Sequence, residues 1–184
     1  MQRLLTVLAV VLLAGALVSG SSEAASLRHL SIERLAAASE ACVLARVVDS
    51  TVGWSDSGRV IVTTYTLEQE EVLAGEPPPG PLTLTRVGGE LDGLALTHDG
   101  MPELTVGETA ALFLRERAHG HYVISGLRQG VFRRHGDELV RDLRGINGAP
   151  SRFERLSLDD LRSRVRAAGL DRPALNREPN GERR

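Results

Sequence analysis

The feature that most constrains the fold is a succession of short β-prone segments separated by glycine-rich turns. Val, Ile, Thr and Tyr are concentrated in these segments, and strands at this spacing are typical of a barrel or a sandwich. The sequence therefore predicts a mainly β fold, in which residues 94–97 could add a short strand. The other expected strands are residues 42–51, 59–73, 81–87, 109–115, 121–125, 130–134 and 138–143.

The longest of these strands, residues 59–73, carries a change of phase. Apolar and polar side chains alternate over residues 61–67, but the next apolar residue, Val72, comes five positions after Leu67. An odd step moves the side chain to the opposite face of the sheet. We therefore expect a β-bulge near residues 69–71, which would bend the strand as a barrel corner requires.

A helix is expected at each end of the domain. Ser31 can cap a short first helix, in which Ile32 and Leu35 form an apolar stripe. Near the other end, Ser157 and Asp160 have the spacing of a capping box. The apolar residues that follow step by three and four along one face of the second helix. These residues are Leu158, Leu161 and Val165.

The first 24 residues have the pattern of an export signal. Arg3 precedes an apolar run of 15 residues, 4–18, which is shorter than the ~20 residues that a membrane span needs. Ser22-Glu23-Ala24 matches a signal peptidase site. We expect a secreted or periplasmic product with no stable membrane anchor, while an uncleaved anchor is the alternative. Residues 25–170 would form one domain, and residues 171–184, with two prolines and few apolar side chains, a disordered tail.

Composition limits what the exported domain could be. Cys42 is the only cysteine, so packing and not an internal disulfide must hold the domain together. Its apolar neighbours predict a small buried side chain, with a catalytic thiol or an intermolecular disulfide as alternatives. Residues 25–150 hold 12 arginines and 17 acidic residues, and residues 151–184 hold 9 arginines and 6 acidic residues. Neither part has the strongly basic footprint of a nucleic-acid-binding protein.

The chain contains no catalytic or metal-binding motif. Its histidines lack the H-E-x-x-H spacing, and residues 53–58 miss the G-x-S-x-G nucleophile elbow by one position. We therefore expect no enzymatic activity and no cofactor. The alternative is a hydrolase with a metal site that no motif announces. Its ligands would come from His98, Asp99, Glu103, His119 and His121.

A first candidate for a partner surface is the region of residues 86–103. Arg86, Glu90 and Asp92 lie at its start, and a loop of this length within a compact domain is often functional. The alternative is structural: Gly88-Gly89 would permit a tight turn, and Arg86 would pair with Glu90.

A second candidate combines Trp54 with Gln129. Trp54 is the only tryptophan and is expected at the tip of a hairpin, where an exposed tryptophan can anchor a partner. Residues 127–130, which include Gln129, are expected beside it. The alternative is that Trp54 covers the end of the barrel.

Four segments carry a resemblance to a known family: residues 39–47 (SEACVLARV), 65–75 (YTLEQEEVLAG), 82–84 (LTL) and 107–114 (GETAALFL). They resemble the start of the OB-fold barrel of the netrin and tissue-inhibitor-of-metalloproteinases type. The resemblance implies a small OB-like barrel, closed or partly open, with a short N-terminal and a C-terminal helix. Those inhibitors chelate zinc through an N-terminal cysteine, which is absent near Ala25, so their mechanism is not carried over.

The mature chain also resembles an uncharacterised group of secreted bacterial proteins. The segments in common are residues 86–90 (RVGGE) and 126–130 (GLRQG), and some members carry a metalloprotease domain. We therefore expect a secreted, non-enzymatic binding module that recognises an extracytoplasmic protein or other ligand. The alternatives are an accessory or inhibitor-like component of a secreted metalloprotease system, and the hydrolase considered above.

Overall fold

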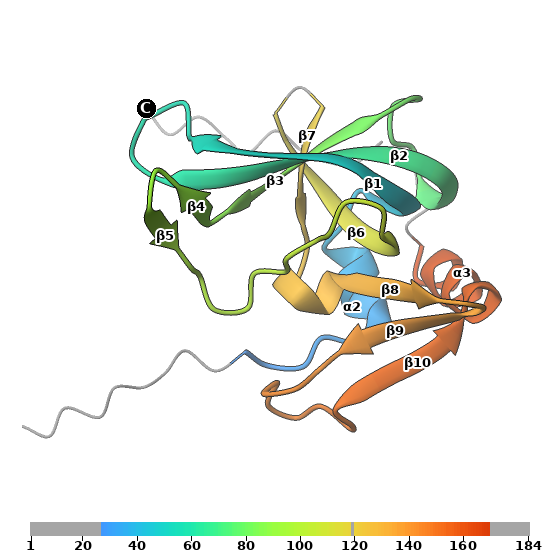
Figure 1. The fold of residues 1–184 in the computed structure, drawn as a ribbon. Coiled ribbons are helices and arrows are strands. Elements are labelled where there is room, and N and C mark those ends of the chain that lie inside the picture. The colour runs from blue at the N-terminus through green and yellow to red at the C-terminus, as the bar shows by residue number, and fades with distance from the viewer. Residues whose placement is uncertain (1–26, 119, 170–184) are drawn as a thin grey trace, which may run out of the picture.

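The computed structural model describes residues 27–118 and 120–169 (Figure 1). The predicted export signal and the predicted disordered tail lie outside the described residues. The helices are α2 (Ile32–Ala37), α3 (Leu158–Ala167) and the short 3-10 helix η1 (Leu127–Gly130). The strands are β1 (Ala41–Trp54), β2 (Ile61–Gly75), β3 (Leu82–Val87), β4 (Gly89–Leu91), β5 (Leu94–Leu96), β6 (Thr109–Ala118), β7 (His121–Ile124), β8 (Val131–His135), β9 (Glu138–Asp142) and β10 (Phe153–Ser157).

Five of the strands close a ring in the order β1-β2-β3-β7-β6, with β1 paired to β6. β3 and β7 run parallel, and the other neighbours in the ring run antiparallel. The predicted mainly β fold, an OB-like barrel with two flanking helices, is confirmed. Beyond β6 the sheet continues through β8, β9 and β10, beside which α2 and α3 lie (Figure 1).

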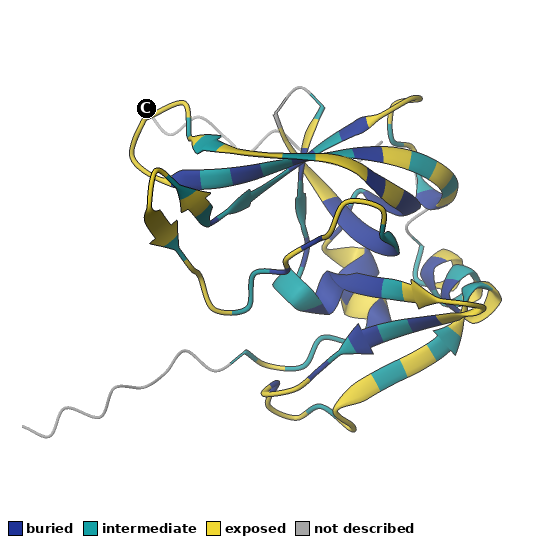
Figure 2. Cartoon of the chain, in the orientation of Figure 1, coloured by how far each residue is buried: buried dark blue, intermediate teal, exposed yellow. Residues whose placement is uncertain are grey.

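The strands that close the ring are buried on both faces. Val43 of β1 and Leu112 of β6 point into the barrel, while Cys42 and Phe113 belong to a second core formed with α2, α3, β8 and β9. A strand that is covered on both sides needs apolar residues at every position. This explains the unbroken apolar runs around Cys42 and Phe113. Along β1, the residues become more exposed towards the end of the strand (Figure 2).

The long hairpin of β1 and β2 is irregular where the phase of the sequence changes. Leu44 pairs with Glu71 and Ala45 with Gln69, so Glu70 is left over and forms a bulge. The predicted bulge at residues 69–71 is confirmed. Two further register shifts leave out Leu73 of β2, between Cys42 and Val43, and Val48 of β1, between Val47 and Asp49.

Both predicted helix caps are present. The Ser31 hydroxyl accepts a hydrogen bond from the backbone N–H of Arg34 (3.3 Å), and the Ser157 hydroxyl accepts one from that of Asp160 (3.1 Å). Of the apolar residues expected in the second helix, Leu161 and Val165 are buried. The sequence did not predict β10, whose residues Phe153–Ser157 pair with β9.

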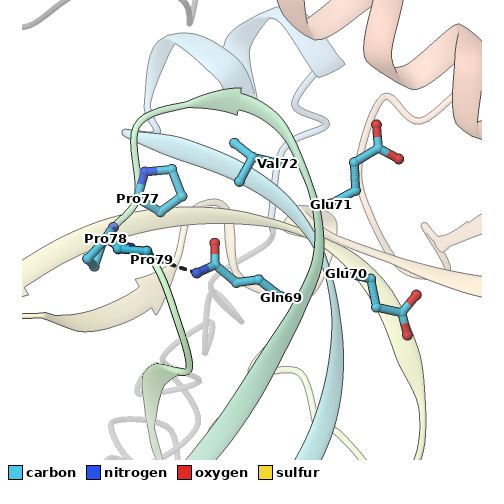
Figure 3. A pocket seen from close by; sticks show the side chains of 7 residues that line it. All are labelled: Gln69, Glu70, Glu71, Val72, Pro77, Pro78 and Pro79. Carbon is cyan, nitrogen blue, oxygen red and sulfur yellow. Dashed lines mark hydrogen bonds between the residues drawn. The ribbon is translucent and has the colours of Figure 1, made fainter.

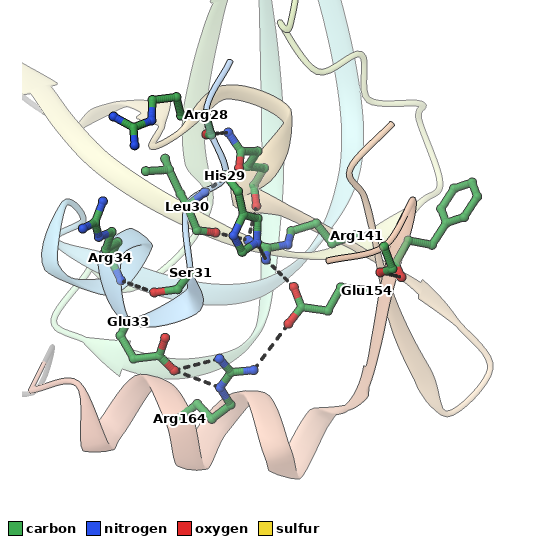
Figure 4. A network of polar contacts seen from close by, with 12 residues as sticks. Arg28, His29, Leu30, Ser31, Glu33, Arg34, Arg141, Glu154 and Arg164 are labelled. Carbon is green, nitrogen blue, oxygen red and sulfur yellow. Dashed lines mark hydrogen bonds and ion pairs between the residues drawn. The ribbon is translucent and has the colours of Figure 1, made fainter. Parts of the chain in front are cut away.

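A buried arginine joins distant parts of the chain (Figure 4). The Arg141 side chain is fully buried and donates hydrogen bonds to the backbone oxygen of Leu30 (2.9 Å) and to Nε2 of His29 (3.2 Å). It pairs with Glu154 of β10, and its guanidinium lies 4.9 Å from the centre of the Phe132 ring. Arg141 therefore connects the segment before α2 with β8, β9 and β10.

The network continues from Glu154 into both helices. Arg164 of α3 contacts Glu154 at 3.4 Å and Glu33 of α2 at 2.7 Å. Burial alone would raise the pKa of Glu33, but hydrogen bonds from Arg164, from the Glu33 backbone and from Ser31 lower it to about 2. The two helices are therefore linked by charged groups at their surface as well as by their apolar faces.

We predict that Arg141→Ala lowers the free energy of unfolding by about 3–5 kcal/mol, because removal of the fully buried side chain leaves a cavity and takes the donor from the oxygen of Leu30. Arg155→Ala is the matched control: Arg155 faces Glu138 at 3.4 Å with both side chains exposed, so the loss should stay below about 1 kcal/mol. Urea unfolding with equal m-values measures both. Equal losses in the two variants would contradict the role given to Arg141.

We also predict a pH-dependent effect of Glu33→Gln. Because the pKa of Glu33 is lowered in the folded state, its ionised carboxylate stabilises the fold at pH values above about 4.5, the pKa in the unfolded chain. This contribution disappears as the pH falls towards 2. The variant should be less stable than the parent at pH 6, by about 1 kcal/mol or less because the pair is half-exposed. Unfolding curves between pH 6 and pH 2.5 should converge, and a constant difference would refute the prediction.

Candidate functional site

The outer half of the β1–β2 hairpin, which we call the ribbon, continues beyond the ring closure, and β3 pairs with its β2 strand over Val62–Leu67 (Figure 1). On the β6 side, pairing of β1 ends at Arg46, and Val47 makes the last contacts: its N–H donates to the Glu108 oxygen (2.9 Å), and its oxygen accepts from Gly107 (2.8 Å). On the β2 side, pairing continues to Trp54 and Ile61. The second half of β1 is therefore held by β2 alone along its length.

The small β4–β5 hairpin packs against this ribbon. Gly88 and Gly89 join it to β3 with φ angles of +109° and +146°, and a Cβ at residue 89 would lie 2.7 Å from Cγ1 of Val52 and 2.9 Å from Oγ1 of Thr63. Glycine is therefore needed for the close approach. The alternative interpretation of Gly88-Gly89 as a tight turn is corrected, because Gly88 is the single residue between β3 and β4 and Gly89 is the first residue of β4.

Arg86 is mostly buried between the barrel and the loop that follows β5. Its side chain is 13% exposed, its Nε donates to the Tyr65 hydroxyl (3.0 Å), and its guanidinium lies 3.8 Å from Glu103. The same hydroxyl accepts a hydrogen bond from the backbone of Leu104 (3.3 Å). Arg86 therefore holds the loop against the barrel. Its ion-pair partner is Glu103 and not Glu90, which corrects the structural alternative drawn from the sequence.

Gln129 does not belong to an exposed surface. It is 2% exposed and binds the backbone of the segment before α2: its Oε1 accepts from Leu30 (2.8 Å), and its Nε2 donates to the oxygen of Arg28 (3.0 Å). The η1 helix that carries it packs beside β6, β7, β8 and β9. The expectation that Gln129 lies beside Trp54 on a partner surface is therefore corrected.

The side chains of Trp54, Glu90 and Asp92 are exposed, and accessible side chains are what a partner surface requires. Trp54 is 50% exposed and pairs across the ribbon with the buried Ile61. Sequence reasoning missed three further apolar side chains on the same ribbon that are more than a third exposed. They are Val48, Val52 and Val60. We call the exposed side chains of Val48, Val52, Trp54 and Val60 the ribbon surface.

A shallow hollow of about 300 Å³ lies at the other end of the hairpin, under the proline loop (Figure 3). The Gln69 amide donates to the backbone oxygens of Pro78 (2.8 Å) and Gly80 (2.6 Å) and so holds this loop. The two acidic residues in the lining are engaged, Glu70 with Thr109 and Arg134 and Glu71 with Arg162. Both carboxylates of the lining are therefore held by other side chains, while Oε1 of Gln69 is buried without a hydrogen-bond partner among the described residues.

Within residues 27–118 and 120–169, no three His, Cys, Asp or Glu side chains are grouped so that they could hold a metal ion. No three of the candidates His98, Asp99, Glu103 and His121 are therefore brought together as metal ligands. The fifth candidate, His119, lies outside the described residues. Cys42 is fully buried in the second core, and burial raises the pKa of its thiol. None of the described helices combines the length and the apolar character of a membrane span.

In comparisons with known proteins, no family model and no curated sequence matches this chain.

We predict that the Cys42 thiol does not react in the folded protein. Thiol reagents attack the thiolate, and a buried thiol with a raised pKa becomes available only when the core opens. Labelling at pH 8 should be at least roughly a hundredfold slower in the native protein than in denaturant. Labelling of the native protein at the rate of free glutathione would instead support a catalytic or intermolecular role of Cys42.

Proposed function

We propose that the protein is an exported binding module that recognises another protein outside the cytoplasm, without a chemical reaction of its own. The observation that carries the proposal is the ribbon surface. Val52 and Trp54 lie on one face of the end of β1, and Val48 and Val60 leave further apolar area in water on the same hairpin. Exposed apolar side chains gathered on one part of a soluble domain are typical of an interaction site. Export is supported by the pattern of the first 24 residues.

The setting of Trp54 also favours protein recognition. Tryptophan is among the residues that contribute most to binding energy at protein interfaces, particularly when neighbouring groups exclude water. Exposed acidic side chains lie on the ribbon and on the β4–β5 hairpin that packs against it, and they would supply a polar rim. They are Asp49, Asp56, Glu90 and Asp92.

Trp54→Ser tests this proposal against Phe153→Ser, which removes another exposed aromatic ring, on β10 at the far end of the sheet. The mature protein, with a photo-reactive side chain at residue 54 or residue 153, is incubated with extracytoplasmic proteins from the source cells. We predict that one protein is cross-linked from residue 54 and not from residue 153. Its affinity should fall at least about tenfold in Trp54→Ser and less than about twofold in Phe153→Ser.

A partner that is cross-linked equally from both positions, or that binds Trp54→Ser as tightly as the parent, would contradict the proposal. Both variants should unfold at nearly the parent temperature, because neither ring belongs to the buried core.

A further inference from the structure

The second half of β1 has an open edge. Within the described residues, β6 pairs only with Ala41–Arg46, and no strand lies on that side of β1 beyond Val47. An unpaired strand edge presents a row of N–H and C=O groups that another chain can use. The edge begins at the ring closure and ends at the ribbon tip, where Trp54 lies.

Two backbone hydrogen bonds show which groups face this edge. Gly88 N–H donates to the oxygen of Ile61 (2.8 Å), so the backbone of Ile61 faces β3, and Ser55 N–H donates to Val60 (2.8 Å) across the hairpin. In an antiparallel ladder, paired residues alternate between facing each other and facing away. Trp54, which pairs with Ile61, therefore directs its N–H and C=O outwards. The same alternation applies to Val52 and Ser50.

Within this edge, residues 50–54 lack the devices that usually protect a strand from pairing. Residues 50–54 contain no proline and no charged side chain. The bulge at Val48 and the exposed Asp49 lie before this segment and not within it. The outer strand β10, in contrast, carries Glu154 and Arg155 at neighbouring positions. Charges and proline are the common means of blunting an edge, so residues 50–54 are suited to accept a further strand.

We propose that the partner binds as an extended, basic peptide segment that adds a strand along residues 50–54. The proposal rests on the proposed function and specifies its mode of recognition. Backbone groups of Ser50, Val52 and Trp54 would supply the pairing, as in other complexes formed by strand addition. Val52 and Trp54 lie two positions apart and so on the same face, where they would contact alternate side chains of the incoming strand.

Charge selects the chemistry of the incoming segment. Asp49 and Asp56 flank the edge, and Glu90 and Asp92 lie on the β4–β5 hairpin that packs against the ribbon. The exposed basic residues of the β1–β2 hairpin are Arg59 and Arg46, and Arg46 is paired with Glu68. A second copy would bring like charges together along the seam, whereas arginine or lysine side chains would be attracted to them. A basic peptide is therefore favoured over self-association.

The probe is an acetylated octapeptide of alternating arginine and valine, with a glutamate–valine octapeptide of the same length as its control. Trp54 is the only tryptophan in the chain, so its fluorescence reports events at the ribbon tip in the full mature protein. We expect the basic peptide to change the Trp54 emission saturably and with an affinity that falls as salt is added. The acidic peptide should produce no change.

Val52→Pro separates strand addition from other modes of binding. Proline removes the N–H that faces the open edge but no donor to β2, and proline is tolerated at such edge positions. Val52→Thr keeps the N–H and the branched shape. We expect Val52→Pro to weaken the peptide at least about tenfold and Val52→Thr to stay within about threefold, with both variants retaining cooperative unfolding.

The outcomes are distinct. Equal affinities of the two peptides, or an affinity that Val52→Pro leaves unchanged, would overturn the inference. So would a dimer in sedimentation that Val52→Pro dissociates, since it would assign the edge to a second copy. If the basic peptide does not bind but a partner is still cross-linked from residue 54, strand addition fails and the proposed function stands. If no protein is cross-linked from residue 54, the result contradicts the proposed function itself.

Discussion

The architecture depends on the different lengths of pairing on the two sides of β1. This strand of 14 residues pairs with β2 along nearly its whole length, whereas β6 pairs only with Ala41–Arg46. The short pairing is enough to close the barrel, because the bulge at Glu70 bends β2 around it. The long pairing carries the rest of the hairpin past the ring. One strand therefore both closes the core and presents an open edge.

The remainder of the fold makes this arrangement rigid. The second core covers the outer face of the closing strands. Its two helices are linked by the ion pair of Arg164 in α3 with Glu33 in α2, and Arg164 also contacts Glu154 of β10. Glu154 in turn pairs with the buried Arg141, which also donates to the backbone before α2. A chain with a single cysteine is thus held together by packing and buried polar contacts and not by an internal disulfide.

Local patterns were sufficient to predict most strands, the two helix caps and the bulge at residues 69–71, because each depends on neighbouring residues. β10 was missed because Phe153–Ser157 lacks β-branched residues and is a strand only through its pairing with β9. The burial of Gln129 and the pairing of Arg86 with Glu103 also depend on contacts that are remote in sequence. The open edge was missed for the same reason, since it depends on where β6 stops.

Amide hydrogen exchange of the free protein, residue by residue, tests the open edge most directly. The amides of Thr51 and Gly53, which face β2, should exchange slowly, whereas those of Ser50, Val52 and Trp54 should exchange close to the rate of an unprotected chain. Such an alternation in five consecutive residues requires a strand that is paired on one side only. Slow exchange at all five amides would contradict the account, because the outer edge of β1 would then be covered.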